Sequence, residues 1–270
     1  MTVEAQKVGE IKGIGTVYRV DAPLDEQIRA FQNVGIQFPY LATPEEIAQI
    51  RLGGVSGSWS RTSVSPVAIK GGDTILYKNS PWLSSPEMAT VAVQAHREGR
   101  FPQLPSAFYE SVKDKAKKEE GMEPEDRTAI AVSQKGDSKL TSDMPEAKFL
   151  LGKLTKQYFG KFALSGQIQF YNLEGDSKNQ ATVNYLWFGN PQYASNLYCR
   201  GRGLGLDYRA FGVLRTGEAS AQNTGYSLSQ IGKANSEVIP SVLGQAGLSG
   251  ITENIARKLS KGLIDRLRGK

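Results

Sequence analysis

Apolar residues recur along the chain with two different periods, and segments of the two kinds alternate. Residues 8–20 place isoleucine and valine among glycines and predict a strand. Leu24, Ile28 and Phe31 then follow at i, i+4 and i+7, which is the spacing of one face of a helix. We therefore expect an α+β fold: a largely antiparallel sheet with flanking helices and a C-terminal helical segment.

Several helix starts are marked by a capping side chain that is followed in the first turn by proline and an acidic residue. This combination begins at Thr43, Ser85 and Asp143, and it satisfies backbone N–H groups that no helical carbonyl reaches. A further helix is predicted over residues 105–118. At the C-terminus an apolar residue recurs at every fourth position and predicts an amphipathic helix; these residues are Ile251, Ile255, Leu259, Leu263 and Leu267.

Two hairpins are predicted from runs of alternating residues. Residues 58–70 and 73–78 flank a Gly-Gly turn. Residues 161–188 alternate apolar with polar side chains on both sides of a Glu-Gly-Asp turn, so we expect a long antiparallel hairpin with one polar face.

Changes in composition divide the chain into four segments. Residues 1–100 predict an N-terminal α+β lobe, and the charged, proline-broken residues 101–145 predict an insertion or mobile connector. Residues 146–223 predict an antiparallel β-rich lobe, and residues 224–270 predict a C-terminal helical tail.

The formal charge of +6 is unevenly distributed. Residues 1–145 carry 17 basic and 19 acidic side chains, whereas residues 146–270 carry 16 basic and 8 acidic ones. All of the net positive charge therefore lies in the second part of the sequence. Such an asymmetry is typical of contact with nucleic acid or a membrane surface, although a solvated basic face without a partner gives the same pattern.

Several kinds of site are excluded or disfavoured. The single cysteine, Cys199, excludes an intramolecular disulfide and zinc sites built from paired cysteines. No phosphate-binding loop motif occurs, and no carboxylate cluster has metal-ligand spacing, so we expect no cofactor and no metal. The only histidine, His96, falls in the last turn of a predicted helix, where no nucleophile can be assigned to it, so enzymatic activity is disfavoured. No signal peptide and no membrane span is predicted, and we expect a cytoplasmic location.

The best candidate site lies in residues 193–215, where two predicted strands flank the glycine-rich residues 201–205. Tyrosine faces stack on bases and arginines bind phosphates, so these residues predict a surface that binds RNA or single-stranded DNA. The candidate residues are Tyr193, Tyr198, Arg200, Arg202, Tyr208, Arg209 and Arg215. Alternation along the last strand places Arg209, Phe211 and Arg215 on one face.

An assembly role is the alternative. Glycines and arginines ahead of Phe211-Gly212 give a layout that resembles, over a short stretch, the glycine-rich loop of the ferredoxin-like RNA-binding proteins of CRISPR complexes. That resemblance implies a subunit of a larger particle or ribonucleoprotein complex. In this interpretation the hairpin of residues 161–188 and the C-terminal helix are contact surfaces, and the helix docks on its own fold, on a second copy, on a partner protein or on an anionic membrane.

Overall fold

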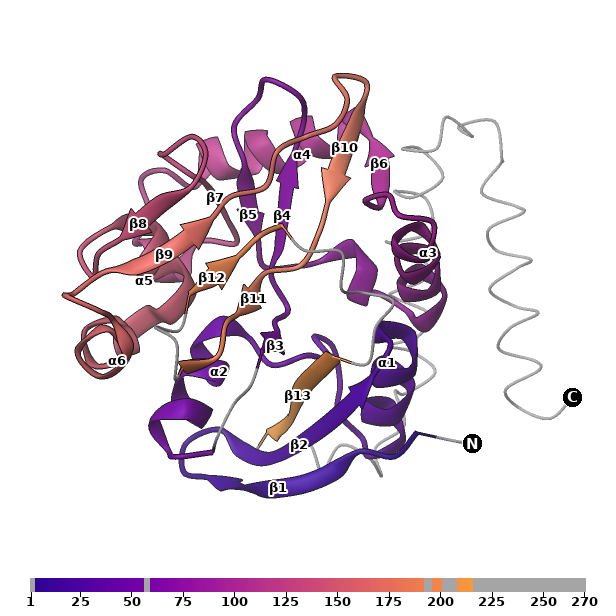
Figure 1. Cartoon of the computed structure of the whole chain (residues 1–270), viewed down its shortest axis with the longest axis vertical. Helices are drawn as coiled ribbons and strands as arrows, with labels where there is room; N and C mark the ends of the chain where they lie inside the picture. The colour runs from indigo at the N-terminus through magenta and orange to yellow at the C-terminus, as the bar shows by residue number, and fades with distance from the viewer. Residues whose placement is uncertain (1–2, 56–58, 192–195, 201–207, 216–270) are drawn as a thin grey trace, which may run out of the picture. The chain divides into compact units, whose positions relative to one another are not determined.

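The computed structural model describes residues 3–55, 59–191, 196–200 and 208–215 (Figure 1). These residues belong to one compact unit, Met1–Ala219. It contains an eight-stranded sheet, in the order β1-β2-β13-β3-β11-β12-β9-β8, and a five-stranded sheet, in the order β6-β10-β4-β5-β7. The α+β prediction is confirmed. No helix of the described residues is long and apolar enough to cross a membrane.

The elements have the following bounds. The larger sheet comprises β1 (Gln6–Ile11), β2 (Gly15–Ala22), β3 (Ser60–Arg61), β8 (Ser138–Leu140), β9 (Ile168–Tyr171), β11 (Trp187–Phe188), β12 (Leu197–Tyr198) and β13 (Tyr208–Arg215). The smaller sheet comprises β4 (Ser65–Ala68), β5 (Ile75–Tyr77), β6 (Gln103–Pro105), β7 (Ala129–Ala131) and β10 (Gln180–Val183). The helices are α1 (Leu24–Asn33), α2 (Pro44–Leu52), α3 (Pro86–Arg97), α4 (Ser106–Lys118), α5 (Pro145–Leu151) and α6 (Thr155–Phe162), with short 3-10 turns η1 (Pro81–Leu83), η2 (Pro124–Asp126) and η3 (Gly152–Leu154).

The predicted helix starts are largely confirmed. At α2 the Thr43 hydroxyl accepts the Glu46 N–H at 3.2 Å, and the Glu46 carboxylate accepts the Thr43 N–H at 2.8 Å, which is a complete capping box. At α3 the Ser85 hydroxyl accepts the Met88 N–H at 3.3 Å, a side-chain cap without the reciprocal half of a capping box. The cap expected at Asp143 is wrong, because the N-cap of α5 is Met144 and no side chain caps this helix. The helix stops at Gly152, whose φ of +52° favours glycine.

Each face of the larger sheet packs on a different set of helices. On one face Phe170, Phe188 and Phe211 pack against α2, α5 and α6. On the other face Val20 and Ala210 pack against α1 and α3, which lie side by side (Figure 1). The alternating strands therefore separate two hydrophobic cores.

Strand β13 is held between β2 and β3 in the larger sheet. It pairs antiparallel with β2 over its whole length, from Tyr208↔Ala22 to Arg215↔Gly15. At its C-terminal end the Arg215 guanidinium donates to both carboxylate oxygens of Glu46, at 2.9 and 3.1 Å. The capping box of α2 and the last described strand are thus joined through one carboxylate.

Two expectations about strand pairing are wrong. Residues 8–20 do not form a single strand, because β1 and β2 are the two arms of a hairpin. Residues 161–188 do not form a hairpin: β9 pairs with β8 and β12 in the larger sheet, whereas β10 pairs with β4 and β6 in the smaller one. Period-two alternation identifies a strand but does not identify its partner, and here the partners are distant in sequence. The hairpin at the Gly-Gly turn is confirmed as β4 and β5.

The predicted division into separate lobes is not seen in the sheets. Both sheets contain strands from all three predicted segments, 1–100, 101–145 and 146–223. Residues 101–145 are an integral part of the fold rather than a mobile connector, since Tyr109, Val112 and Ile130 are buried in the two cores. The predicted tail, residues 224–270, lies outside the described residues.

We expect Glu46 to stabilise the fold because it joins two elements that are distant in sequence. Replacing Glu46 with Gln removes the charge from a carboxylate that is 8 % exposed and leaves Arg215 without its ion pair. The free energy of unfolding, measured by urea denaturation, should fall by about 2 kcal/mol. Glu110→Gln, on the exposed face of α4, should change it by less than about 0.5 kcal/mol. Equal effects of the two substitutions would contradict this role.

Glu119 should make stability depend on pH. Its carboxylate accepts the Thr128 hydroxyl and N–H groups, both at 2.7 Å, and the Ala129 N–H at 3.0 Å. Burial opposes ionisation, but these hydrogen bonds outweigh it and hold the pKa of Glu119 below its ordinary value of 4.5. The stabilisation is therefore present above pH 4.5 and is lost as the pH falls through the lowered pKa of the folded state.

The test is the variant Glu119→Gln, compared with Glu120→Gln at the neighbouring exposed position. At neutral pH the first should lower the free energy of unfolding by about 1–2 kcal/mol, whereas the second should leave it nearly unchanged. The difference in free energy of unfolding between Glu119→Gln and the wild type should become smaller as the pH is lowered. A difference that stays constant down to acid pH would show that the carboxylate charge is not responsible.

Candidate ligand-binding surface

A row of aromatic side chains crosses the larger sheet on the face that also packs against α1 and α3. Paired residues of neighbouring strands share a face, so the pairs Trp187↔Tyr198 and Tyr198↔Tyr171 place these three rings on one face. Trp59 directly precedes β3 and also contacts Tyr198. We call Trp59, Tyr198, Tyr171 and Arg200 the aromatic row.

The rings of the row stack on one another. Tyr198 and Tyr171 are stacked, with centroids 4.4 Å apart and ring planes within 11° of each other. The Trp59 ring lies 4.5 Å from the Tyr198 ring at an angle of 47°. Since β9 lies on one side of β12 and β3 on the other, Tyr198 has a ring neighbour on each side.

Arginine ends the row. The Arg200 Cζ lies 5.6 Å from the centroid of Tyr171, and the guanidinium also forms an ion pair with Asp137 at the start of β8. Burial raises the pKa of Tyr171, and the neighbouring Tyr198 and Asp137 raise it further, while Arg200 opposes them. The phenol is therefore neutral at physiological pH and can donate a hydrogen bond.

Glycine and asparagine hold Tyr198 in place. A Cβ on Gly189 would lie only 3.0 Å from the Tyr198 ring, so this position favours glycine. The Asn196 amide donates to the Tyr198 hydroxyl at 3.5 Å. Next to Tyr198, the backbone N–H of Cys199 donates to the Tyr171 carbonyl at 2.7 Å, which fixes β12 against β9. The row is thus supported by backbone as well as by its own stacking.

The structure brings together only some of the residues proposed from the sequence. Tyr198 and Arg200 are neighbours in the aromatic row. Arg209 and Arg215 lie on β13, which β3 and β11 separate from β12, and they pair with Asp21 and Glu46. The Phe211 ring expected between these two arginines is buried in a core, with 1 % of its surface exposed. Tyr208 begins β13, and only its backbone is described; Tyr193 and Arg202 lie outside the described residues.

Two members of the row were not predicted. Trp59 is 39 % exposed, which is unusual for a residue of this size, and Tyr171 ends β9. Period-two alternation does place Tyr171 on the polar side of its strand. The partners could not be deduced, because the row is assembled from three strands that are not consecutive.

The two other residues considered from the sequence occupy packed positions. Cys199 is fully buried, and burial raises the pKa of its thiol well above the ordinary value, so the reactive thiolate is disfavoured. His96 is 5 % exposed and meets Phe101 edge to face, with ring centroids 5.8 Å apart. Within the described residues no cluster of three or more histidine, cysteine or carboxylate side chains has the geometry of a metal site.

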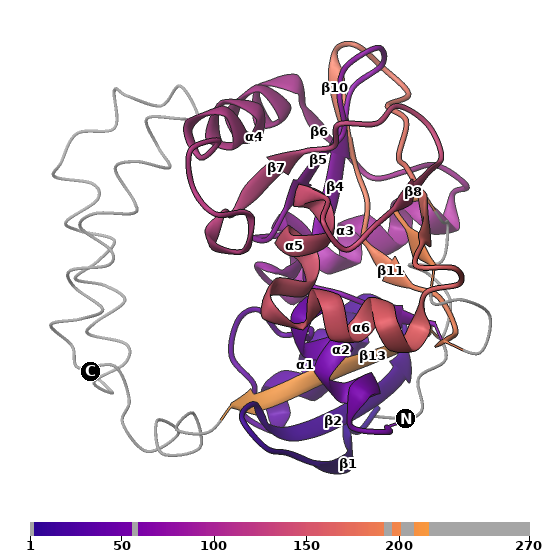
Figure 2. The same ribbon diagram turned by 90° about the vertical axis from the view of Figure 1, so that its left-hand side faces the viewer.

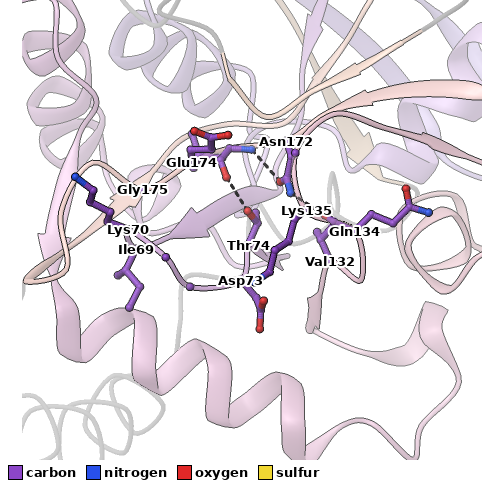
Figure 3. A pocket seen from close by; sticks show the side chains of 14 residues that line it. Ile69, Lys70, Asp73, Thr74, Val132, Gln134, Lys135, Asn172, Glu174 and Gly175 are labelled. Atoms are coloured by element: carbon purple, nitrogen blue, oxygen red, sulfur yellow. Dashed lines mark hydrogen bonds between the residues drawn. The ribbon is translucent and has the colours of Figure 1, made fainter.

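A pocket of about 280 Å³ lies where strands pass from one sheet to the other (Figure 3). Its walls come from the β4–β5 turn, the β7–β8 connection and the β9–β10 connection. The buried polar groups are engaged with backbone: the Thr74 hydroxyl donates to the Leu173 carbonyl at 2.7 Å, and the Asn172 amide donates to the Gln134 carbonyl at 3.2 Å. These groups tie the connections together, and the charged side chains at the rim have both signs.

Comparison with known proteins bears on the fold. No protein-family model matches the sequence, and no curated protein matches it. One solved structure does match, described as "Accommodation of massive sequence variation in Nanoarchaeota by the C-type lectin fold", with 14% sequence identity and a TM-score of 0.50. The alignment covers 76% of this chain and 100% of the other. This chain has a fold similar to the C-type lectin fold. At this identity the likeness extends to the fold alone, and the C-type lectin fold is itself α+β.

Tyr198 should be needed for the stacking in the row. Tyr198→Ala should lower the free energy of unfolding by about 2 kcal/mol and expose the indoles of Trp59 and Trp187 to solvent. Tryptophan emission should shift to the red, and quenching by acrylamide should increase. Tyr198→Phe keeps the ring and should leave both signals as in the wild type. A normal emission spectrum for Tyr198→Ala would contradict the stacked arrangement.

Proposed function

We propose that this protein binds another protein or a peptide through the aromatic row. The observation that carries the proposal is a self-stacked set in which Trp59 and Arg200 are exposed and Tyr198 and Tyr171 are half-buried. Tryptophan, tyrosine and arginine are the residue types that dominate binding energy at protein interfaces. Because the rings are already ordered by one another, little side-chain entropy is lost when a partner binds.

The charge distribution supports a protein ligand over a phosphate backbone. Arg200, Arg209 and Arg215 are each paired with a carboxylate of this chain, so a phosphate would have to displace Asp137, Asp21 or Glu46. Over the described residues, 25 basic side chains oppose 22 acidic ones. A nearly neutral surface with aromatic edges suits protein recognition, whereas nucleic-acid binding relies on uncompensated positive charge.

The structural neighbour is compatible with such a role. Its description concerns the accommodation of massive sequence variation by the C-type lectin fold. A fold that tolerates changed side chains on an unchanged framework suits a surface that recognises a ligand, although fold alone does not assign function.

Binding of RNA or single-stranded DNA is the second candidate. It is favoured by Arg200 beside two tyrosines and by the positive charge of residues 146–270. Arginine and tyrosine together contact both the backbone and the bases of single strands.

The proposal is tested by selecting a displayed random peptide library on the full-length chain. Selected peptides should bind with Kd values that rise about tenfold or more for Trp59→Ala and Tyr171→Ala, measured by fluorescence anisotropy. Phe38→Ala is the matched control, because Phe38 is an exposed aromatic residue outside the row, and it should leave the Kd unchanged.

Labelled oligonucleotides measured in parallel separate the two candidates. If single-stranded RNA or DNA binds with an affinity that falls steeply with salt and is weakened by Arg200→Ala, the second candidate replaces the first. Selected peptides whose binding does not depend on Trp59 would also overturn the protein-binding proposal.

A further inference from the structure

The outer side of α6 and the η3 turn before it carry exposed positive charge. Thr155, Tyr158 and Phe159 are the buried residues of this helix and define its inner side. At 100° per residue, Lys156 and Lys161 fall on the two outer flanks of the helix, about 140° apart, and both are exposed. Lys153, in the η3 turn that leads directly into α6, is exposed as well.

No carboxylate of the described residues forms an ion pair with these three lysines. The only acidic residue in 145–167 is Glu146, which is 1 % exposed and accepts the Ser133 N–H at 2.8 Å. Glu45 accepts the backbone N–H of Lys153 and also attracts its charge, and the Lys161 ammonium donates to the Leu52 carbonyl at 3.3 Å. Lys156 has no such contact among the described residues. The arrangement differs from that of Arg200, Arg209 and Arg215, each of which is paired.

An apolar side chain projects from the turn that follows the helix. Leu164, three residues after Lys161, is 67 % exposed, the highest value among the large hydrophobic residues described. The turn is tight: Ser165 has a φ of +52°, and the Gln167 N–H donates to the Leu164 carbonyl at 3.1 Å. A leucine is therefore held in solvent at the end of the same helix that carries the exposed lysines.

The geometry points to a peripheral membrane contact: the outer face of α6 docks on a bilayer surface that contains anionic phospholipid. Lysine ammonium groups bind the headgroups, and Leu164 inserts at the boundary of the acyl chains. A phosphate backbone would satisfy the lysines equally well, but it offers no apolar environment for Leu164. The leucine therefore favours the lipid surface over nucleic acid.

The position of α6 is compatible with this contact. The helix packs on the face of the larger sheet that is opposite the aromatic row, because Tyr158 and Phe159 lie in the core with Phe170 and Phe188. Figure 2 shows α6 in front of the strands on this side. With α6 on a membrane, the aromatic row points away from the bilayer and stays available to a ligand.

The test uses the full-length chain and co-sedimentation with vesicles of phosphatidylcholine, with and without phosphatidylserine. Binding should require phosphatidylserine. The double variant Lys153→Gln/Lys156→Gln should weaken it about 25-fold, about fivefold for each lysine. Leu164→Ser, which keeps the charge, should weaken it about tenfold.

A charge-matched variant separates this surface from net charge. Lys117→Gln/Lys118→Gln removes two exposed lysines from α4 and should leave vesicle binding unchanged. Trp59→Ala should also leave vesicle binding unchanged. A failure of the membrane proposal can therefore be distinguished from a failure of the aromatic row as a ligand site. The proposal is overturned if vesicles of phosphatidylcholine alone bind equally, if the two double variants behave alike, or if Leu164→Ser binds as the wild type does. Loss of oligonucleotide binding in Lys153→Gln/Lys156→Gln, with no vesicle binding by the wild type, would assign the face to nucleic acid instead.

Discussion

The pairing of β13 with β2 is the constraint on which the larger sheet depends. It brings a strand from near residue 215 into the middle of a sheet that begins at residue 6, and eight consecutive residue pairs hold it there. Both cores use this strand, because Phe211 and Val213 pack on one side and Ala210 on the other. Closing so long a loop costs entropy, and the ladder, the burial and the Arg215–Glu46 pair together offset that cost.

Strand pairing between distant parts of the chain also changes how the charge distribution along the sequence is interpreted. Along the sequence, acidic side chains dominate the first part and basic ones the second. In three dimensions, Asp21, Glu46 and Asp137 of the first part meet arginines of the second. Much of the apparent basic character of residues 193–215 is therefore internal pairing. Lys153, Lys156 and Lys161, which form no ion pair among the described residues, lie instead on η3 and α6.

The larger sheet separates the two surfaces that we propose to be functional. One face is covered by α1 and α3 over part of its width and then carries the aromatic row. The other face is covered by α2, α5 and α6, and α6 carries the exposed Lys156 and Lys161. A sheet with alternating side chains keeps such surfaces apart, since neighbouring residues on a strand point to opposite faces. The two contacts therefore need not compete for the same side of the protein.

The sequence by itself determined the fold class and most local structure: the α2 capping box, the Ser85 cap, the β4–β5 hairpin and the two kinds of periodicity are all present. These features depend on neighbouring residues, which a single sequence displays directly. Only the tertiary structure decided which strands pair, and therefore that Trp59, Tyr171 and Tyr198 form one row while Arg209 lies elsewhere. Alternation fixes the face on which a side chain lies but not the neighbouring strand, because partners are selected by burial and loop closure over the whole chain.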